Sequence, residues 1–466
     1  MNKLINKLAH LDKSELIEFI VKLHSDSPEL QQKIELFASK ESADEQIKLL
    51  KKRIQSIKRG NRFIDYRHTR SFCSELHDIA DSISALVSQN TQHKAVFELA
   101  DAFMQSHEKV YERADDSSGY IGDIYRTFVG TWLTAAKQLR LVQQTTKPTK
   151  NTINWQDEVL QRFNNNGYSV WDYLLEKTAI LLSTSELENL ATHFENKARH
   201  ALKNPPENDR YGYTALRAQI GLKGVGQALN NPELIEKGTL LGSPEPNELQ
   251  KQSLAEMLLN LGHAKRALTW LQGSWPQRHG YEQQKLLDAC YQALGDVNAQ
   301  VELRRQQYQQ LPNHHNLTAL LEISSEDERE ILTRQAVAKA QTIDDFSSRV
   351  GSLIDLKATD VAAVQVINNT SELPRVGYYA LPDWAKHFAK NGQPLAASLC
   401  YRSLIDDILQ SARTKAYHYA ATYLEKLFVL APKITDYQTH IHHSEYVEQL
   451  KAQHKRKSGF WARVNF

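Results

Sequence analysis

A short turn, in which a glycine separates two helix-like segments, occurs three times in this chain. The three turns contain Leu261-Gly262-His263, Leu294-Gly295-Asp296 and Asn391-Gly392-Gln393. Gly262 and Gly295 lie 33 residues apart, close to the period of about 34 residues that is typical of repeated helical hairpins. Alanines follow the first and third glycines, and small residues beside a turn let two helices pack closely. The spacing therefore predicts an all-α fold of stacked helix pairs.

Composition favours helices over sheets. The 466 residues include 19 glycines and 13 prolines, both below average usage, and long stretches are rich in Leu, Ala, Glu, Lys and Gln. We expect a helical-hairpin (TPR-like) repeat array, or α-solenoid, with an N-terminal helical segment. The polar connector Thr145–Asn154 is the predicted boundary. It gives an N-terminal helical segment over residues 1–145 and a TPR-like repeat region over residues 155–466.

Several helix starts carry a capping pattern, in which Ser or Asp precedes Glu by three residues. The pattern predicts helix starts at Asp12–Glu15, Ser185–Glu188 and Ser325–Glu328. The longest amphipathic pattern lies in the last third of the chain, where apolar residues recur at steps of three or four between Leu395 and Leu427, with one wider step before Ile405. Both features support the helical prediction.

Charge, cysteine content and hydropathy restrict the class of protein. A formal net charge of +2 argues against a chain that binds nucleic acid over its whole surface. Cys73, Cys290 and Cys400 have no metal-ligand spacing, so we expect buried, reduced thiols and no metal. The N-terminus has no continuous apolar stretch, and no later run reaches the roughly 18 residues of a membrane span. We expect a cytoplasmic protein with no membrane segment and no cofactor.

Three segments of the chain resemble a known bacterial family. Residues 115–123 read DDSSGYIGD, and similar family patterns follow in residues 394–417 and 454–461. On these residues the chain resembles an uncharacterised all-helical family, domain of unknown function 6880, over most of its length. The resemblance implies an all-α fold and a bacterial source but no activity. Related helical modules accompany SWIM zinc fingers, but this chain lacks the Cys-x-Cys and Cys-x-His ligands, so no zinc site is implied.

Acidic residues in the segment 115–123 form a candidate polar binding cluster. A calcium loop with Gly119 at its sixth position would place Ala114 at the first ligand position, so the segment does not fit such a loop. Asp and Ser side chains here could instead cap a helix that starts near Tyr120. The remaining hypothesis is contact with a polar ligand. The acidic members are Asp115, Asp116 and Asp123.

A second part of the candidate cluster lies near residue 404. Arg402 and Asp406 are four residues apart on a predicted helix, which suits a modest ion pair. Adjacent carboxylates such as Asp406 and Asp407 point about 100° apart on a helix and cannot readily share acid–base work. A structural role between repeats is therefore one interpretation, and a polar binding site is the other.

Histidines suggest two further sites that the sequence supports less well. Arg413 and His418 match the Arg-x4-His spacing of helical-bundle ribonucleases of the HEPN kind. Residues five apart on a helix are only partly on one face, and 18 histidines make one such match probable by chance.

His440, His442 and His443 lie in a polar connector without a carboxylate or cysteine at ligand spacing. Solvated histidines rather than a metal site are expected there.

Basic residues crowd two regions that also contain aromatic residues, as a nucleic-acid contact requires. The alternative is a solvated helix face whose aromatic side chains point into the core. The first region holds Lys51, Lys52, Arg53, Lys58, Arg59 and Arg62, followed by Arg67 and Arg70, with Phe63, Tyr66 and Phe72 among them. The second holds Lys455, Arg456 and Lys457 beside Phe460 and Trp461.

These observations lead to three functional hypotheses. The first is a non-catalytic helical-repeat scaffold that binds a protein or peptide through its concave face, since such arrays bind through that surface. The second is a nucleic-acid-binding protein that uses the basic region around residues 48–70 and the basic C-terminal tail. The third is a HEPN-like ribonuclease centred on Arg413 and His418. The identity of the partner and the oligomeric state stay open.

Overall fold

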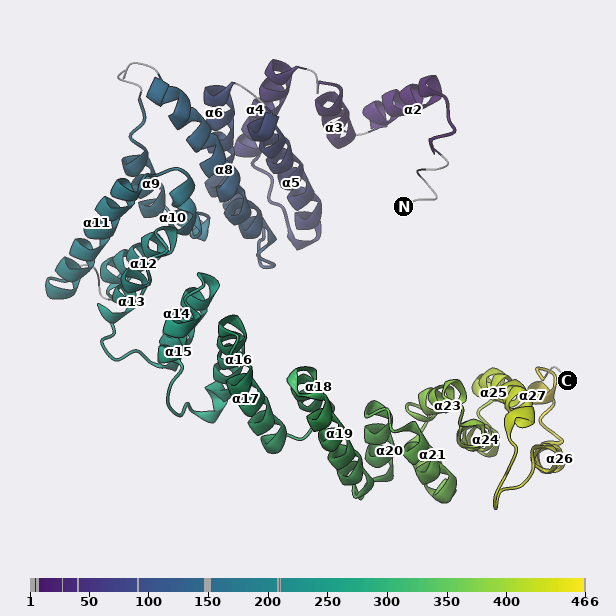
Figure 1. The fold of residues 1–466 in the computed structure, drawn as a ribbon. Coiled ribbons are helices and arrows are strands. Elements are labelled where there is room, and N and C mark those ends of the chain that lie inside the picture. The colour runs from purple at the N-terminus through teal and green to yellow at the C-terminus, as the bar shows by residue number, and fades with distance from the viewer. Residues whose placement is uncertain are drawn as a thin grey trace. The chain divides into compact units, whose positions relative to one another are not determined.

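The computed structural model is helical throughout the residues that it describes, which are 5, 8–26, 28–39, 42–89, 92–145, 152–207, 209 and 211–464. No β-strand occurs in these ranges, where a single isolated parallel bridge joins Ile64 and Ala114. Figure 1 shows helices that follow one another along the chain, with neighbours in sequence lying side by side within each unit. The predicted all-α class is therefore confirmed.

The chain divides into two compact units, residues 1–294 and residues 295–466. The helices of the first unit are α2 (Lys13–Asp26), α3 (Pro28–Ala38), α4 (Ala43–Arg59), α5 (Tyr66–Gln89), α6 (His93–Met104), α7 (His107–Tyr111), α8 (Tyr120–Thr145), α9 (Trp155–Asn164), α10 (Leu174–Lys177), α11 (Thr184–Lys203), α12 (Tyr213–Ala228), α13 (Pro232–Leu240), α14 (Glu248–Asn260), α15 (Ala264–Trp270) and α16 (Gln277–Leu294).

The second unit contains shorter helices and several single turns. Its helices are α17 (Val297–Gln310), α18 (His314–Ile323), α19 (Glu326–Gln341), α20 (Phe346–Asp355), α21 (Thr359–Asn368), α22 (Leu373–Val376), α23 (Leu381–Lys390), α24 (Pro394–Gln410), α25 (Tyr417–Leu430), α26 (His443–His454) and α27 (Ser458–Trp461). Within this unit α23, α24 and α25 pack in succession, and α24 also contacts α21 and α22. One buried apolar cluster runs from Ala340 to Val464.

The boundary predicted at residues 145–154 differs from this division, because it falls inside the first unit. Trp155 follows that connector and packs edge-on against Phe97, with 5.2 Å between ring centroids. Its indole N–H donates to Gln143 Oε1 at 3.0 Å. A buried apolar cluster extends across the connector, from Ile47 to Val225. A polar connector identifies a loop, but it does not show whether one core continues on both sides.

The glycine turns found in the sequence have the backbone that only glycine adopts freely. Gly262, Gly295 and Gly392 have φ of 86°, 68° and 75°, in the left-handed region. At Gly262 and Gly392 the next N–H donates to the carbonyl five residues before it, at 2.8 and 2.9 Å. This bond is typical of a helix C-terminus that ends in a left-handed residue. The prediction of tight glycine turns between helices is confirmed at these positions.

The same corner also occurs without glycine. Asn230, Lys357 and Ala412 have φ of 50°, 59° and 50°, and the residue after each donates to the carbonyl five residues earlier. A search for glycine misses these corners, because non-glycine residues enter the left-handed region only when the surrounding structure holds them there. His263 Nε2 lies 2.9 Å from Asn230 Oδ1. This hydrogen bond joins residues that are 33 positions apart and links two successive corners.

One predicted helix start was placed two residues too late. The capping box of α11 is formed by Ser183 and Glu186, not by Ser185 and Glu188. Both pairs fit the pattern, and the structure favours the first because Glu186 also binds Arg140 of α8. The start at Ser325 is confirmed, since its hydroxyl accepts from the Glu328 N–H.

The three cysteines are free and buried, as predicted. Burial raises the pKa of the Cys290 thiol to about 11, which keeps it protonated and unreactive at neutral pH.

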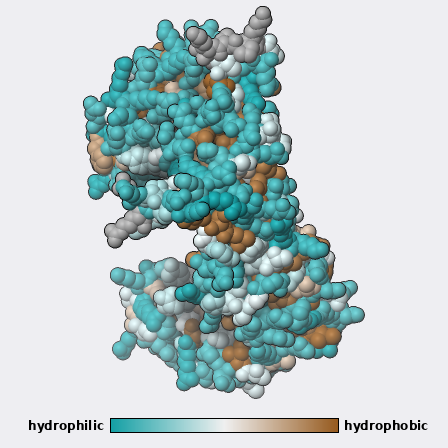
Figure 2. Space-filling model, turned by 90° about the vertical axis from the view of Figure 1, so that its left-hand side faces the viewer, coloured by the Kyte–Doolittle hydropathy of each residue, from teal (hydrophilic) through white to brown (hydrophobic). Residues whose placement is uncertain are grey.

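Among the described residues, no helix is both long enough and apolar enough to cross a bilayer. The face of the protein drawn in Figure 2 is mainly hydrophilic, with hydrophobic side chains in separate small patches.

Candidate functional site

Two aromatic side chains of the first basic region point outward rather than into the core. Phe63 and Tyr66 are 63% and 64% exposed, whereas Phe72 is buried. Four exposed arginines lie close to them in sequence, and none of these arginines forms an ion pair in the described part of the chain. We call this set the basic surface; it consists of Arg59, Arg62, Phe63, Tyr66, Arg67 and Arg70.

The loop that carries Arg62 and Phe63 is held by Arg113. Its guanidinium donates to the carbonyls of Ile57 and Arg62, at 3.2 and 3.4 Å, and lies 5.0 Å from the centre of the Phe72 ring. A Cβ on Gly60 would lie 2.8 Å from the Arg113 Cζ, so a side chain there would displace the arginine. This packing fixes the loop while leaving Phe63 in solvent.

Four members of the predicted basic set do not belong to this surface. Arg53 is only 6% exposed, because it lies on the face of α4 that buries Leu50, Ile54 and Ile57. Its placement in a solvent-exposed nucleic-acid patch was therefore wrong. Lys51 lies 3.7 Å from Glu98 in an ion pair, while Lys58 is half-buried. Lys52 is exposed on α4.

The basic tail differs from the basic surface in how its aromatic side chains lie. Lys455 and Arg456 are exposed, and Lys457 lies over the Tyr417 ring at 6.0 Å. Phe460 is fully buried, and the Trp461 indole donates to the His454 carbonyl at 3.0 Å. Up to residue 464, where the described chain ends, the tail therefore has exposed cations but no outward aromatic platform for base stacking.

The structure joins the acidic segment 115–123 to the base of the basic surface. The Asp115 N–H donates to the Ile64 carbonyl at 2.9 Å, and Thr69 Oγ1 donates to the Asp115 carbonyl at 2.9 Å. No local sequence pattern indicates this contact, since Thr69 and Asp115 lie 46 residues apart. Asp65 is also present beside the surface, where it pairs with His68 at 2.7 Å.

Asp116 caps α8, which agrees with the helix-cap interpretation of segment 115–123 rather than with contact to a polar ligand. Its carboxylate accepts from the N–H groups of Ile121 and Gly122, at 2.9 and 3.0 Å. Burial, together with Asp116, raises the pKa of Tyr111 to about 12. Gly122 is needed here because a Cβ would lie 2.7 Å from the Tyr111 hydroxyl. Asp123 is exposed and pairs with Arg126 at 2.6 Å.

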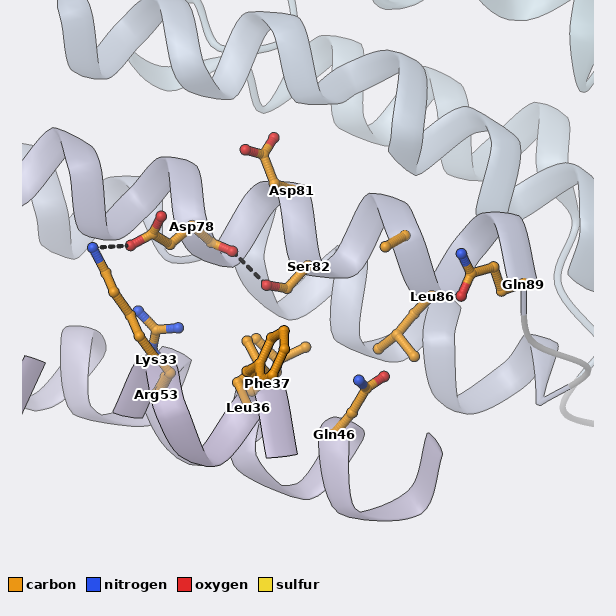
Figure 3. Close-up of a pocket in the computed structure, with 12 residues that line it drawn as sticks. Lys33, Leu36, Phe37, Gln46, Arg53, Asp78, Asp81, Ser82, Leu86 and Gln89 are labelled. Atoms are coloured by element: carbon orange, nitrogen blue, oxygen red, sulfur yellow. Dashed lines mark hydrogen bonds and ion pairs between the residues drawn. The ribbon is translucent and has the colours of Figure 1, made fainter. Parts of the chain in front are cut away.

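A groove of about 730 Å³ lies among α3, α4 and α5 (Figure 3). Lys33 reaches from α3 to Asp78 of α5 and forms an ion pair at 2.8 Å. Ser82 donates to the Asp78 carbonyl one turn earlier, at 2.6 Å. Leu36 and Phe37 lie between these polar groups and Leu86. The groove combines charged and apolar walls, and the sequence contained no pattern that identified it.

In the second unit, Arg402 is buried and lines a cavity of about 460 Å³. Its Nη1 donates to the Ile441 carbonyl at 2.9 Å, and its Cζ lies 4.8 Å from the centre of the Tyr446 ring. Its Nε and Nη2 are shielded from solvent, and among the described residues they have no hydrogen-bond partner. The nearby Ser403 hydroxyl, which also lines the cavity, has no partner either. We call this space the Arg402 cavity.

Arg402 and Asp406 do not form the predicted ion pair. The Tyr446 hydroxyl donates to Asp406 Oδ1 at 2.8 Å, and Arg402 uses the Ile441 carbonyl instead. Burial raises the pKa of Asp406, although the hydrogen bond from Tyr446 and the charge of Arg402 oppose this. Burial also lowers the pKa of Arg402. Both residues lie in one unit, while Asp115, Asp116 and Asp123 lie in the other.

A sequence signal for the burial of Arg402 was present. Leu395, Leu399, Arg402, Asp406 and Leu409 follow one another at steps of four, three, four and three. That spacing is the apolar stripe of a helix, so a cation and an anion stand where core residues are expected. Tyr446, which contacts both, lies some 40 residues later, and no local pattern connects it to them.

The Arg413 and His418 pair does not have the geometry assumed for it. Arg413 precedes a 3₁₀ turn over Thr414–Ala416, and His418 lies in the next helix, α25. The Arg413 guanidinium binds both oxygens of Asp407, at 2.9 and 3.2 Å. His418 lies against Tyr419, with 3.9 Å between ring centroids. Nothing in these contacts directs the two side chains toward a common reacting group.

The histidines of the connector before α26 have structural contacts. His440 Nε2 lies 3.0 Å from the Ile367 carbonyl, and the His442 ring lies tilted against Tyr437 with 4.1 Å between ring centroids. Burial lowers the pKa of His443. In the part of the chain that the structure describes, no group of three or more His, Cys, Asp or Glu side chains is placed to hold a metal ion.

Comparison with known proteins identifies one family. The sequence profile of a family of unknown function (DUF6880) matches residues 2–223 and 247–463. No curated protein and no solved structure matches the chain.

Proposed function

The chain belongs to the family of unknown function DUF6880, and we propose that it is a non-catalytic helical-repeat scaffold that binds a protein or peptide partner. In this proposal its helix pairs form a TPR-like α-solenoid. Such arrays bind extended partners along the surface that their stacked helices create.

The observation that carries the proposal is the recurrence of one helix-ending corner. Left-handed corners stand at residues 230, 262, 295, 357, 392 and 412, and the first three are 32 and 33 residues apart. The hydrogen bond between Asn230 and His263 ties two of them together. The steps of 32 and 33 residues match the period of about 34 residues of stacked hairpins, whereas the later steps, of 62, 35 and 20 residues, are less regular.

Grooves between helices supply places for a partner. The groove among α3, α4 and α5 exposes Phe37 next to a Lys33–Asp78 ion pair. Apolar side chains surrounded by charged groups are typical of surfaces that bind peptides and proteins.

The test is capture by the tagged full-length chain from a bacterial lysate, with and without nuclease. We expect a protein partner that survives nuclease treatment and that binds again when both proteins are purified. Recovery of nucleic acid alone, or of a protein that does not rebind in purified form, would argue against the scaffold.

A second candidate function, nucleic-acid binding, is favoured by one specific observation. Phe63 and Tyr66 are exposed beside four arginines that form no ion pair with any described residue. Single-stranded nucleic acid uses this combination for stacking and phosphate contact. The nearby acidic groups Asp65 and Asp115 oppose it.

Replacing both Phe63 and Tyr66 by alanine is expected to weaken binding of a single-stranded RNA about tenfold or more, because each lost ring removes a stacking contact. Fluorescence anisotropy at several salt concentrations measures the effect. Changing Arg59, Arg62, Arg67 and Arg70 to glutamate should abolish binding and its salt dependence. Tyr281→Ala removes an exposed ring elsewhere in the same unit and is the control. Binding that is unaffected by both sets of changes would exclude this surface.

A further inference from the structure

The Arg402 cavity contains a guanidinium edge that the protein leaves unused. Nη1 is occupied by the Ile441 carbonyl, and the ring of Tyr446 covers one face of the group. The remaining donors, Nε and Nη2, lie on the same edge of the guanidinium plane. That edge binds the two oxygens of a carboxylate or phosphate side by side.

Leaving such donors buried without a partner is unfavourable. A buried donor that lacks an acceptor costs about 1–3 kcal/mol, and more when it is charged. Native structures therefore pair almost all buried polar groups with protein, water or ligand. Arg402 is 6% exposed and is not compensated by an ion pair in the described part of the chain. Arg402 lines the cavity, and an anion in the cavity reaches this edge once the groups that shield Nε and Nη2 from solvent move aside.

The other groups of the cavity restrict which anion fits. Asp406 lies on the same helix face and keeps one oxygen outside its bond with Tyr446. A second carboxylate repels a doubly charged phosphate, but it attracts a group that combines one negative charge with an N–H donor. Ser403 offers an unused hydroxyl in the same wall. His440 also lines the cavity, where its Nε2 lies against the Ile367 carbonyl.

We propose that the Arg402 cavity binds the carboxyl end of a peptide, with the terminal carboxylate on Arg402 and the adjacent amide N–H on Asp406. A terminal residue carries one carboxylate and one N–H next to each other, which matches these two side chains. A volume of about 460 Å³ lies in the range of pockets that enclose small ligands. The inference rests on the proposed role in peptide binding and names the feature of the partner that is recognised.

The experiment compares three fluorescent pools of random hexapeptides on the full-length protein by anisotropy. One pool ends in a free carboxylate, the second ends in an amide, and the third ends in an amide but contains an internal glutamate. We expect only the first pool to bind measurably. Equal binding of the amidated pool, or preferential binding of the internal glutamate pool, overturns the assignment of a peptide terminus.

Substitutions connect the binding to the cavity. Arg402→Lys retains the charge but lacks the two-donor edge, and it should weaken binding of the free-carboxylate pool roughly ten- to hundredfold. Ser403→Ala should weaken it severalfold. Arg375→Lys alters an exposed arginine of α22 that pairs with Glu372 and should change nothing. Unchanged binding in Arg402→Lys, with the helical circular dichroism spectrum retained, overturns the proposal.

Competition distinguishes the two anions that suit the same edge. Acetate should displace the free-carboxylate pool more effectively than inorganic phosphate, and the reverse order overturns the proposal. If Arg402→Lys does not fold, this competition and the comparison of peptide pools still decide the matter on the unmodified protein. If a captured partner binds Arg402→Lys as tightly as the unmodified protein, the scaffold proposal stands and this site is excluded. If the unmodified protein captures no protein partner at all, both proposals are excluded.

Discussion

Replacing Trp132 by alanine is expected to destabilise the first unit by about 3–5 kcal/mol, the usual loss for a large aromatic side chain in a packed core. Trp132 is fully buried in α8. Its ring packs edge-on against Trp171 at 5.2 Å and tilted against Phe97 at 5.6 Å. Its indole N–H donates to Asp101 Oδ1 at 3.0 Å. Urea unfolding of the full chain, followed by near-ultraviolet circular dichroism, measures the change.

Trp132→Phe is the matched control, because it keeps a ring in the same place and removes the indole N–H. We expect a loss of roughly 1–2 kcal/mol. Asp101 is not stranded in either variant, since Arg162 remains 3.1 Å from it. A loss of less than about 1 kcal/mol for alanine would contradict the packing of this core and the continuity of the first unit across residues 145–154.

Glu186→Ala is expected to destabilise the first unit by about 2–4 kcal/mol, since it breaks a helix cap and leaves a partly buried arginine without its anion. Arg140 donates to both oxygens of Glu186, at 2.9 and 3.1 Å. The backbone N–H and the hydroxyl of Ser183 donate to the same carboxylate, at 2.8 and 2.7 Å. The side chains of Arg140 and Glu186 are 19% and 26% exposed, so water replaces little of this network.

The dependence of this effect on pH gives an independent check. Burial raises the pKa of Glu186, but the hydrogen bonds from Arg140 and Ser183 outweigh it, so the pKa lies below its ordinary value of 4.5. A lowered folded-state pKa means that the stabilisation is complete above the unfolded value and is lost as the pH falls through the folded value. The unfolding free energies of wild type and Glu186→Ala should therefore converge in acid.

Glu195→Ala serves as the control on the same helix. Glu195 pairs with Arg199 and Lys237, whose side chains are 57% and 42% exposed, and exposed pairs contribute about 1 kcal/mol or less. If Glu195→Ala and Glu186→Ala cost the same, the Arg140 network does not join α8 to α11 as described.

The candidate sites could be predicted only in part, and individual residues show why. The spacing of Arg402 and Asp406 within an apolar stripe identifies a buried charge. It does not identify Tyr446, which changes the expected ion pair into a hydrogen bond and frees one edge of the guanidinium. Arg53 likewise lies in a segment rich in basic residues, as a surface residue would. Its position in the helical repeat, however, puts it on the buried face of α4.

Local signals determined several features without the structure. Low glycine and proline content, helical periodicity and glycine turns fixed an all-α chain, because backbone preferences and capping act within a few residues. Contacts between distant residues were decided by tertiary packing alone. Four features depend on side chains 30 or more residues away: the division at residue 294, the choice of Glu186 over Glu188, the outward rings of Phe63 and Tyr66, and the closing of the Arg402 cavity. No local sequence pattern specifies which of these distant side chains come into contact.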